Sequence, residues 1–176
     1  MASPKSAVVR LGWQGPALDD LGAQRALRAA SRVLTGRLQQ ELREKRGLTY
    51  NIEAKLTPVQ GSRATWLGTT FEVAPDRAND ALAVARDVFQ QFAATGPDQR
   101  ELDAALASLK NDIEKAEASI EYWANLLLGL ESRGVSLAEI ERAPDANARL
   151  TAADVRKATS RYVTDRGRFE LLTAGS

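Results

Sequence analysis

The sequence contains neither histidine nor cysteine in its 176 residues. Without cysteine, the chain forms no disulfide and offers no thiol nucleophile. Without histidine or cysteine, it lacks the general base of a Ser-His-Asp triad and the nitrogen and sulfur ligands that zinc prefers. The commonest hydrolytic chemistries are therefore excluded for this polypeptide acting alone.

An excess of charge of one sign is also missing. Lys and Arg number 24 against 23 Asp and Glu, which gives a net charge of +1, whereas a nucleic-acid binder usually carries a concentrated basic surface. Arg25, Arg28 and Arg32 share one helix face by their spacing and are the basis of a nucleic-acid-binding alternative. Acidic residues nearby, such as Asp19 and Asp20, favour a solvated face instead. We expect no nucleic-acid partner.

Long apolar runs are absent as well. No segment approaches the ~20 apolar residues of a membrane-spanning helix. Residues 1–6 also lack the apolar core of a secretory signal peptide. We therefore expect no membrane insertion, and the chain shows no signal peptide of its own.

The hydrophobic pattern predicts one domain that spans residues 1–176. Strands are expected at residues 6–13, 48–58, 63–73 and 168–173, and the second and third form an antiparallel hairpin. Helices are expected at residues 19–46, divided at Gly36 and stopped by Gly47, at residues 75–94, and from 98 to about 130. Ser136 with Glu139, and Thr151 with Asp154, have the spacing that begins two shorter helices. This order predicts an α+β fold of the split βαβ type, an antiparallel or mixed sheet with helices on one face.

The helix that begins near residue 98 has a distinctive pattern. Asp98 and Glu101 have the spacing of a capping box, and apolar residues from Leu102 to Leu130 recur at steps of four and three. A coiled coil is one interpretation of this stripe. The flanking strands favour a long helix that lies across a sheet and ends at residues 133–134. We assign the large aromatic residues to core packing: Trp13, Trp66, Trp123, Tyr122 and Tyr162.

The most distinctive segment is RLQQELREKRGLTY, residues 37–50. It predicts a helix end rich in cations, then a stop at Gly47 and an aromatic residue before a strand. Cations near a helix C-terminus interact favourably with its dipole, at roughly 0.3–1 kcal/mol each. The segment is therefore compatible with a solvated, well-capped helix end that has no further role.

The same segment resembles the signature L-x-x-x-L-R-E-K-x-G-x-x-Y of the non-catalytic domains of pitrilysin/insulinase-type zinc metallopeptidases, the inverzincins. Four other segments resemble this family in the expected order: residues 6–16 (SAVVRLGWQGP), 96–102 (GPD followed by Glu-Leu), 119–130 (SIEYWANLLLGL) and 150–162 (LTAADV followed by Arg-Tyr). The resemblance covers almost the whole chain.

The resemblance implies how such a domain works. Peptidases of this family are built from homologous α+β domains around a closed chamber, and the first domain carries the zinc motif H-x-x-E-H. The domain opposite presents an Arg and a Tyr to the bound peptide, and these positions correspond to Arg43 and Tyr50 here. An Arg donates to a peptide carbonyl or carboxylate, and a Tyr hydroxyl donates to the oxyanion of the reaction.

The missing histidines identify which domain this is. The chain is not catalytic alone, and the resemblance implies a C-terminal, chamber-completing domain that is a fragment of a longer peptidase, with the bacterial periplasm as its compartment. Its partner is then the H-x-x-E-H domain of the same parent chain or of another subunit, its ligand is a peptide, and it binds no metal itself because the zinc belongs to the catalytic domain. A zinc site built from carboxylates alone, such as Glu41, Glu44, Glu114 and Glu117, would be unusual.

A second hypothesis assigns the chain to another functional class. Domains of this family also serve as inert scaffolding or assembly modules that only complete a chamber. Such a module would bind a partner protein through the apolar long helix or through an exposed sheet edge. Its function would tolerate the loss of Tyr50.

Overall fold

The computed structural model describes residues 6–128, 130 and 134–174. Four strands are formed by β1 (Ala7–Gln14), β2 (Ala54–Pro58), β3 (Thr65–Val73) and β4 (Arg168–Ala174). The helices are α1 (Leu21–Leu38), α2 (Ala78–Thr95), α3 (Gln99–Glu117), α4 (Ile120–Leu128), α6 (Leu137–Glu141), α7 (Ala143–Ala148) and α8 (Ala152–Tyr162). A π-helical segment, Gln39–Glu44, continues α1, and a 3₁₀ turn, Pro75–Arg77, precedes α2. Within the described residues, no helix is long and apolar enough to span a membrane.

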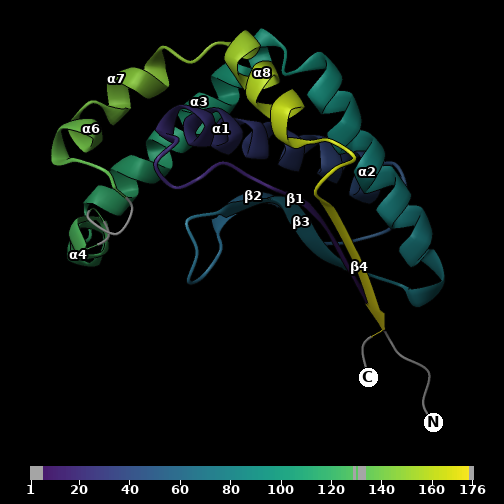
Figure 1. Ribbon diagram of the computed structural model, residues 1–176. Helices are drawn as coiled ribbons and strands as arrows, with labels where there is room; N and C mark the ends of the chain where they lie inside the picture. The colour runs from purple at the N-terminus through teal and green to yellow at the C-terminus, as the bar shows by residue number, and fades with distance from the viewer. Residues whose placement is uncertain (1–5, 129, 131–133, 175–176) are drawn as a thin grey trace.

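The strands form one antiparallel sheet in the order β2-β3-β1-β4. The first strand is central because it pairs with β3 on one side and with β4 on the other. Helices α1 and α2 pack against one face of the sheet and α8 packs against both of them, whereas none of the described helices lies on the opposite face (Figure 1). The predicted α+β fold with helices on one face is confirmed.

The core lies between the sheet and these three helices. Alternate residues of β1 point into it, and Val9, Leu11 and Trp13 are almost completely buried. The Trp13 ring packs against Phe89 of α2 with 4.9 Å between ring centroids. Its indole N–H donates to the backbone carbonyl of Thr164, 2.8 Å away, so this buried polar group is satisfied. The first strand and α8 are thereby linked across the core.

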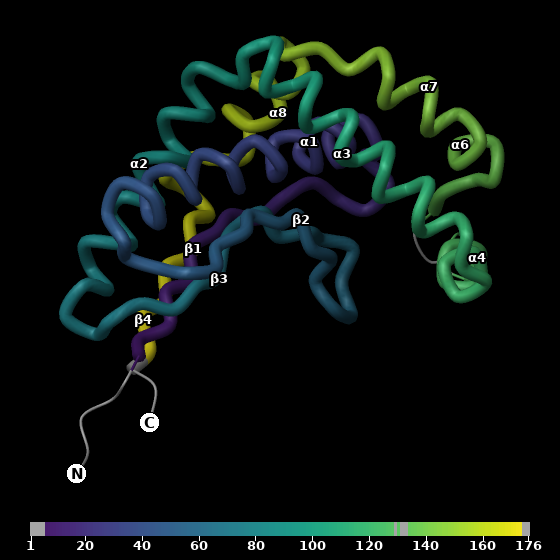
Figure 2. The backbone as a smooth tube through the Cα atoms, turned by 180° about the vertical axis from the view of Figure 1, so that it is seen from behind, coloured from purple at the N-terminus to yellow at the C-terminus, as the bar shows by residue number. Residues whose placement is uncertain are grey.

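The predicted long helix is interrupted and does not lie across the sheet. Its start is confirmed, because Asp98 and Glu101 form the capping box, but α3 ends at Glu117 and a separate helix begins at Ile120. The main contacts of α3 are with α1, α4 and α7. Figure 2 shows α4, α6 and α7 extending beyond the sheet. The apolar stripe was misleading because its second half is exposed, and residue 133, part of its predicted end, lies outside the described residues.

Other boundaries shift for local reasons. Gly36 does not divide the first helix, since α1 passes through it and only changes to a π-helix at Gln39. The second predicted strand begins six residues late, at Ala54, because residues 48–53 leave the helix end as an irregular segment. The predicted hairpin, the capping boxes at Ser136 and Thr151, and the last strand are confirmed. Helix α7 was not predicted.

A half-buried ion pair fixes α1 against the start of α3. The guanidinium of Arg37 donates from Nε and from a terminal nitrogen to the two carboxylate oxygens of Glu101, at 2.8 and 2.7 Å. The same guanidinium donates to the carbonyl of Gly96 and lies 5.0 Å from the centroid of the Phe92 ring. This hydrogen bonding from Arg37 is the chief cause that lowers the pKa of Glu101, and the backbone amide of Asp98 acts in the same direction.

We predict that Glu101→Gln destabilises the fold by about 1 kcal/mol at neutral pH. Gln retains the capping role of this position but loses the charge that pairs with Arg37. A carboxyl group whose pKa is lowered by folding stabilises the folded state above its unfolded pKa, near 4.5, and this stabilisation is lost as the pH falls through the folded-state pKa. Urea denaturation at a series of pH values should therefore show the difference between the two proteins shrinking below pH 4.5. A difference that is independent of pH would contradict this assignment.

Two glycines near the end of the first helix allow a matched comparison. A Cβ added at Gly36 or at Gly47 meets nothing within 4 Å, but Gly47 has a φ of +59°. We predict that Gly36→Ala stabilises the chain by roughly 0.5–1 kcal/mol, because Ala loses less conformational entropy in a helix. Gly47→Ala should destabilise it by about 1 kcal/mol, because a side chain is strained in the left-handed region. Thermal unfolding monitored by circular dichroism should give a higher Tm for Gly36→Ala and a lower Tm for Gly47→Ala than for the unaltered chain.

Candidate functional site

The helix end that carries the candidate site is anchored in the core. Leu38 and Leu42 are completely buried, and the intervening turn is π-helical. The chain leaves this turn through Gly47, whose positive φ confirms the predicted cap, and the amide of Leu48 donates to the carbonyl of Leu42 at 2.8 Å. Because Leu42 points inward, Arg43 lies on the outer side of the turn and is exposed. A π-helical turn inside a helix is often found at a functional site.

Two of the other cations in this segment are neutralised locally. Glu41 accepts hydrogen bonds from both Lys45 and Arg46. The hydrogen bond from Lys45, followed by that from Arg46, lowers the pKa of the Glu41 carboxyl. Lys45 and Arg46 therefore serve the helix end itself, as does Arg37 through its pair with Glu101.

Arg43 differs from these three cations. In the part of the chain that the structure describes, no carboxylate pairs with it, and its guanidinium lies 4.9 Å from the centroid of the Tyr50 ring. This is the distance of a cation–π contact. Tyr50 is 77% exposed, which is unusual for a tyrosine, and its hydroxyl has no partner among the described residues. The two residues predicted as a pair are thus brought together, with their donor groups available.

Two cavities meet at Arg43 and Tyr50. The first, of about 530 Å³, extends from these residues over α1, β2 and β3, and its lining includes Lys55 and Thr70. The second, of about 490 Å³, extends the other way and has residues 47–50 on one side and residues 72–74 on the other. Since both cavities share the pair, Arg43 and Tyr50 stand at the middle of one elongated depression.

The lining of the first cavity includes Trp66 and Gly68, and the Trp66 ring also lies against Gly12. A Cβ added at Gly12 would lie 2.1 Å from the indole Nε1 of Trp66, and one added at Gly68 would lie 2.4 Å from its Cζ2. The ring therefore covers both glycines on the helix-free face of the sheet. Glycine within a strand often marks such a close approach.

The assignment of the aromatic residues to the core is only partly correct. Trp13 is buried and Tyr162 packs against the core, but Trp66 is half-buried in the cavity and Trp123 is 40% exposed. The paired strand glycines were the signal that Trp66 lies on the open face. The contribution of β3 to the depression was not predicted, because the second strand was expected to run alongside the whole of β3.

The residues that the structure describes form no group that fits a metal ion. Across residues 6–128, 130 and 134–174, no group of three or more His, Cys, Asp or Glu side chains is placed so that it could hold a metal ion. The four carboxylates considered from the sequence are thus not gathered into such a group. The donors at the candidate site are a guanidinium and a hydroxyl, which bind anions and oxygen acceptors rather than cations.

Comparisons with known proteins show which family the chain resembles. Residues 2–109 match the protein family described as the peptidase M16 inactive domain. The chain is 26% identical over 162 residues to the chloroplastic stromal processing peptidase of Pisum sativum, and this alignment covers 85% of the chain and 13% of that protein. The chain therefore spans only a small part of the curated relative that it matches.

Solved structures share the fold. The peptidase M16 inactive domain from Pseudomonas fluorescens superposes with a TM-score of 0.86 at 23% identity, over 99% of this chain and 42% of that one. The ferredoxin protease FusC in complex with Arabidopsis ferredoxin superposes with a TM-score of 0.78 at 15% identity, over 100% of this chain and 20% of that one. At these identities the likeness shows the fold alone. The family match spans more than half of this chain, and the chain therefore belongs to the peptidase M16 inactive domain family.

Proposed function

We propose that this chain is the substrate-contacting, chamber-completing domain of a zinc metallopeptidase, and that Arg43 and Tyr50 contact the bound peptide. In this family the zinc belongs to the catalytic domain. The water-activating groups would accordingly come from a partner domain that carries H-x-x-E-H, within a longer parent chain or on a separate subunit. The observation that carries the proposal is the exposed Arg43–Tyr50 pair, whose donors are free within the described residues.

The chemistry of Arg43 and Tyr50 suits contact with a peptide whose cleavage is carried out by groups of a partner domain. The guanidinium of Arg43 presents several N–H donors in a plane, which match a peptide carbonyl or a carboxylate. The Tyr50 hydroxyl can donate one hydrogen bond to the oxyanion that develops as water attacks the scissile carbonyl. The cation–π contact holds both groups together, so that less conformational entropy is lost when they bind.

The length of the relatives supports the assembly part of the proposal. The chain corresponds to 13% of the stromal processing peptidase and to 20% of FusC, whose solved structure includes a ferredoxin. We therefore propose that the domain works within a longer peptidase and that the substrate is a peptide or an extended protein segment.

We predict that Arg43→Ala and Tyr50→Phe each lower kcat/KM of the parent enzyme by roughly 10²-fold, since one oxyanion donor contributes about 2.7–4 kcal/mol to the transition state in other enzymes. Lys45→Ala is the matched control, because Lys45 lies on the same helix end but pairs with Glu41. It should change kcat/KM less than about twofold. Steady-state hydrolysis of a fluorogenic peptide measures all three variants. Unchanged kcat/KM in both Arg43→Ala and Tyr50→Phe would remove the roles assigned to these residues.

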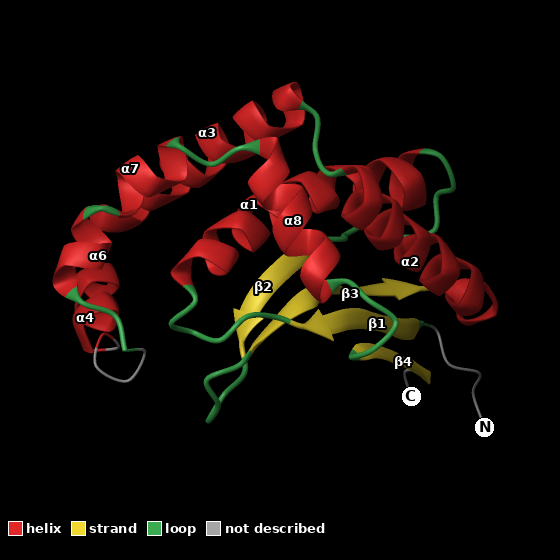
Figure 3. Ribbon diagram, turned by 45° about the horizontal axis from the view of Figure 1, so that its top comes forward, coloured by secondary structure: helices red, strands yellow, loops and turns green. Residues whose placement is uncertain are grey.

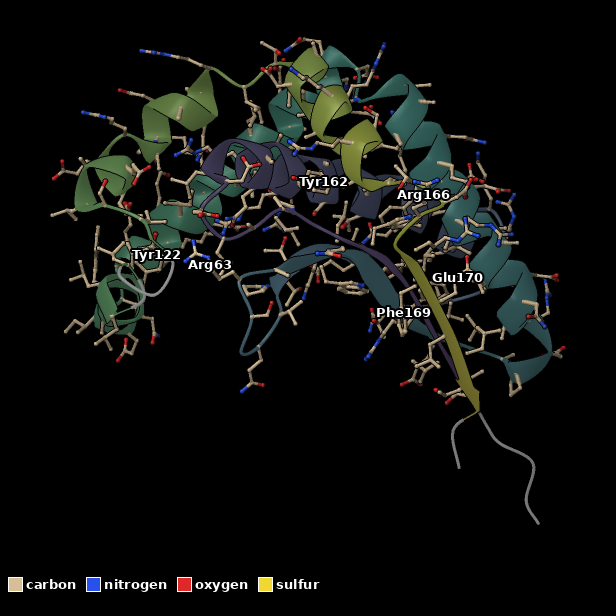
Figure 4. The ribbon with its side chains drawn as sticks, viewed as in Figure 1. Arg63, Tyr122, Tyr162, Arg166, Phe169 and Glu170 are labelled. Atoms are coloured by element: carbon tan, nitrogen blue, oxygen red, sulfur yellow. The ribbon has the colours of Figure 1, made fainter. Side chains whose placement is uncertain are left out.

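An inert assembly module is the second candidate, and one surface favours it. Helix α4 is strongly apolar, yet it buries no residue, and Ile120 and Leu128 are each 83% exposed. Figure 4 shows Tyr122 of this helix far from Phe169 of β4, so the apolar surface lies away from that edge of the sheet. Exposed apolar patches of this kind mark contacts with other proteins.

The substrate-contacting domain and the inert assembly module predict opposite effects of Arg43→Ala and Tyr50→Phe on activity. If the domain only completes an assembly, the double change Ile120→Ser with Leu128→Ser abolishes association with the H-x-x-E-H domain, whereas Arg43→Ala and Tyr50→Phe leave activity unchanged. Analytical ultracentrifugation of the mixed domains measures association, and peptide hydrolysis measures activity. Loss of activity in the Arg43 and Tyr50 variants, with association intact, excludes the purely structural candidate.

A further inference from the structure

Part of β3 lacks a neighbour on one side. Strand β2 pairs with β3 only from Thr65 to Thr69, whereas β1 pairs with β3 over Trp66–Val73. Figure 3 shows β3 continuing beside β1 past the point where β2 begins. Within the described residues, the edge of β3 from Thr70 to Val73 therefore has no strand on the β2 side. An unpaired edge of this kind is a template for a further strand.

The hydrogen bonds between neighbouring strands show which way the N–H and C=O groups of this edge point. The amide of Gly15 donates to the carbonyl of Thr65 on the β1 side, and the amide of Val59 donates to the carbonyl of Ala64 on the β2 side. Groups alternate along a strand, so odd-numbered residues of β3 point to β1 and even-numbered residues point away from it. The N–H and C=O of Glu72 accordingly face the open side, whereas those of Phe71 and Val73 are used by β1.

The open edge borders the depression already described. Thr70 lines the first cavity, and Glu72 lines the second. Both cavities have the segment between α1 and β2 on their other side, and both include Arg43 and Tyr50. Four strand residues span about 13 Å at ~3.3 Å each. The edge, the space beside it and the exposed pair thus belong to one elongated site.

The outer edge of β2 differs from this one. The outer side of β2 contains Pro58, which has no N–H, and its Ala54 amide already donates to the Thr35 hydroxyl at 3.0 Å. Proline and side-chain capping are devices that block the addition of a strand. The edge of β3 has neither device between Thr70 and Val73.

We propose that an extended peptide segment binds this domain by strand addition to β3, antiparallel to it and in line with β2, beneath Arg43 and Tyr50. The inference rests on the proposed function, because it describes how the peptide lies at the same site. Recognition then depends on the backbone amides of the peptide and tolerates many side chains, as is general for strand addition. Arg43 and Tyr50 donate further hydrogen bonds to the bound peptide strand. The outward N–H and C=O of Glu72 determine which peptide residue pairs with β3 at that position.

The test uses the 176-residue chain and a fluorescein-labelled peptide of threonine and valine residues with lysines at both ends. Glu72→Pro removes the outward N–H while leaving the hydrogen bonds of Phe71 and Val73 to β1 in place. Glu72→Gln is the control for the lost charge. We expect Glu72→Pro to weaken binding by about tenfold and Glu72→Gln to change it less than about twofold. Circular dichroism verifies that both variants are folded.

Two measurements on the unaltered chain keep the proposal testable if Glu72→Pro does not fold. Two peptides are compared, one methylated on the odd-numbered backbone amides and the other on the even-numbered ones. The peptide whose methylated amides face β3 should not bind, and the other should bind as before. In hydrogen exchange, the Glu72 amide should slow when the peptide binds, while the Phe71 and Val73 amides stay protected throughout. Binding that is unaffected by either methylation pattern, or no binding of the peptide by the unaltered chain, overturns strand addition.

The outcomes separate this inference from the proposed function. If Arg43→Ala and Tyr50→Phe weaken peptide binding while Glu72→Pro and amide methylation do not, the contact roles stand and strand addition is wrong. If Glu72→Pro and methylation weaken binding while Arg43→Ala and Tyr50→Phe do not, strand addition stands and the contact roles are wrong.

Discussion

The candidate site depends on the anchoring of the end of the first helix in the core. Leu38 and Leu42 are fully buried, and their spacing of four residues places both on the same face of the helix end. Core packing of two leucines is worth several kcal/mol, which is more than any surface contact in the same segment contributes. The direction of Arg43 is therefore a consequence of hydrophobic packing, and Gly47 then turns the chain so that Tyr50 returns beneath the guanidinium.

The same anchoring explains why the depression exists. The chain that leaves Gly47 buries Leu48 and Ile52 before it enters the sheet, so β2 cannot begin before Ala54. A shorter β2 leaves part of β3 without a neighbour, and the two cavities occupy the space between β3 and this connecting segment. The first cavity is bounded by α1 as well as by β2 and β3, so the depression lies where the end of the first helix meets the sheet.

The sequence predicted the features that local chemistry determines. The capping boxes that begin at Asp98, Ser136 and Thr151 are present, and Gly47 has the left-handed conformation expected of a helix stop. These signals depend on residues a few positions apart. The pairing of Arg43 with Tyr50 was expected only from the family resemblance, since seven residues of chain do not determine a distance by themselves.

Features that depend on tertiary packing were not predictable in this way. The stripe from Leu102 to Leu130 has helical period, but the period does not reveal that only Leu102 and Ala105 of α3 are buried. Trp66 is an apolar residue in a strand, and its position on the open face follows from contacts with two glycines that are distant in sequence. The start of β2 depends on where the preceding residues find apolar contacts, which no local pattern encodes.

The charges around the site limit what it can do chemically. Glu41, a carboxylate in the same turn as Arg43, has its pKa lowered by hydrogen bonds from Lys45 and Arg46, so it stays ionised at neutral pH and cannot serve as a general acid. Its two hydrogen bonds also occupy the oxygens with which a general base would take a proton. These groups suit the proposed role of holding a peptide and stabilising charge that develops on it, and in that proposal another domain supplies proton transfer to and from the attacking water.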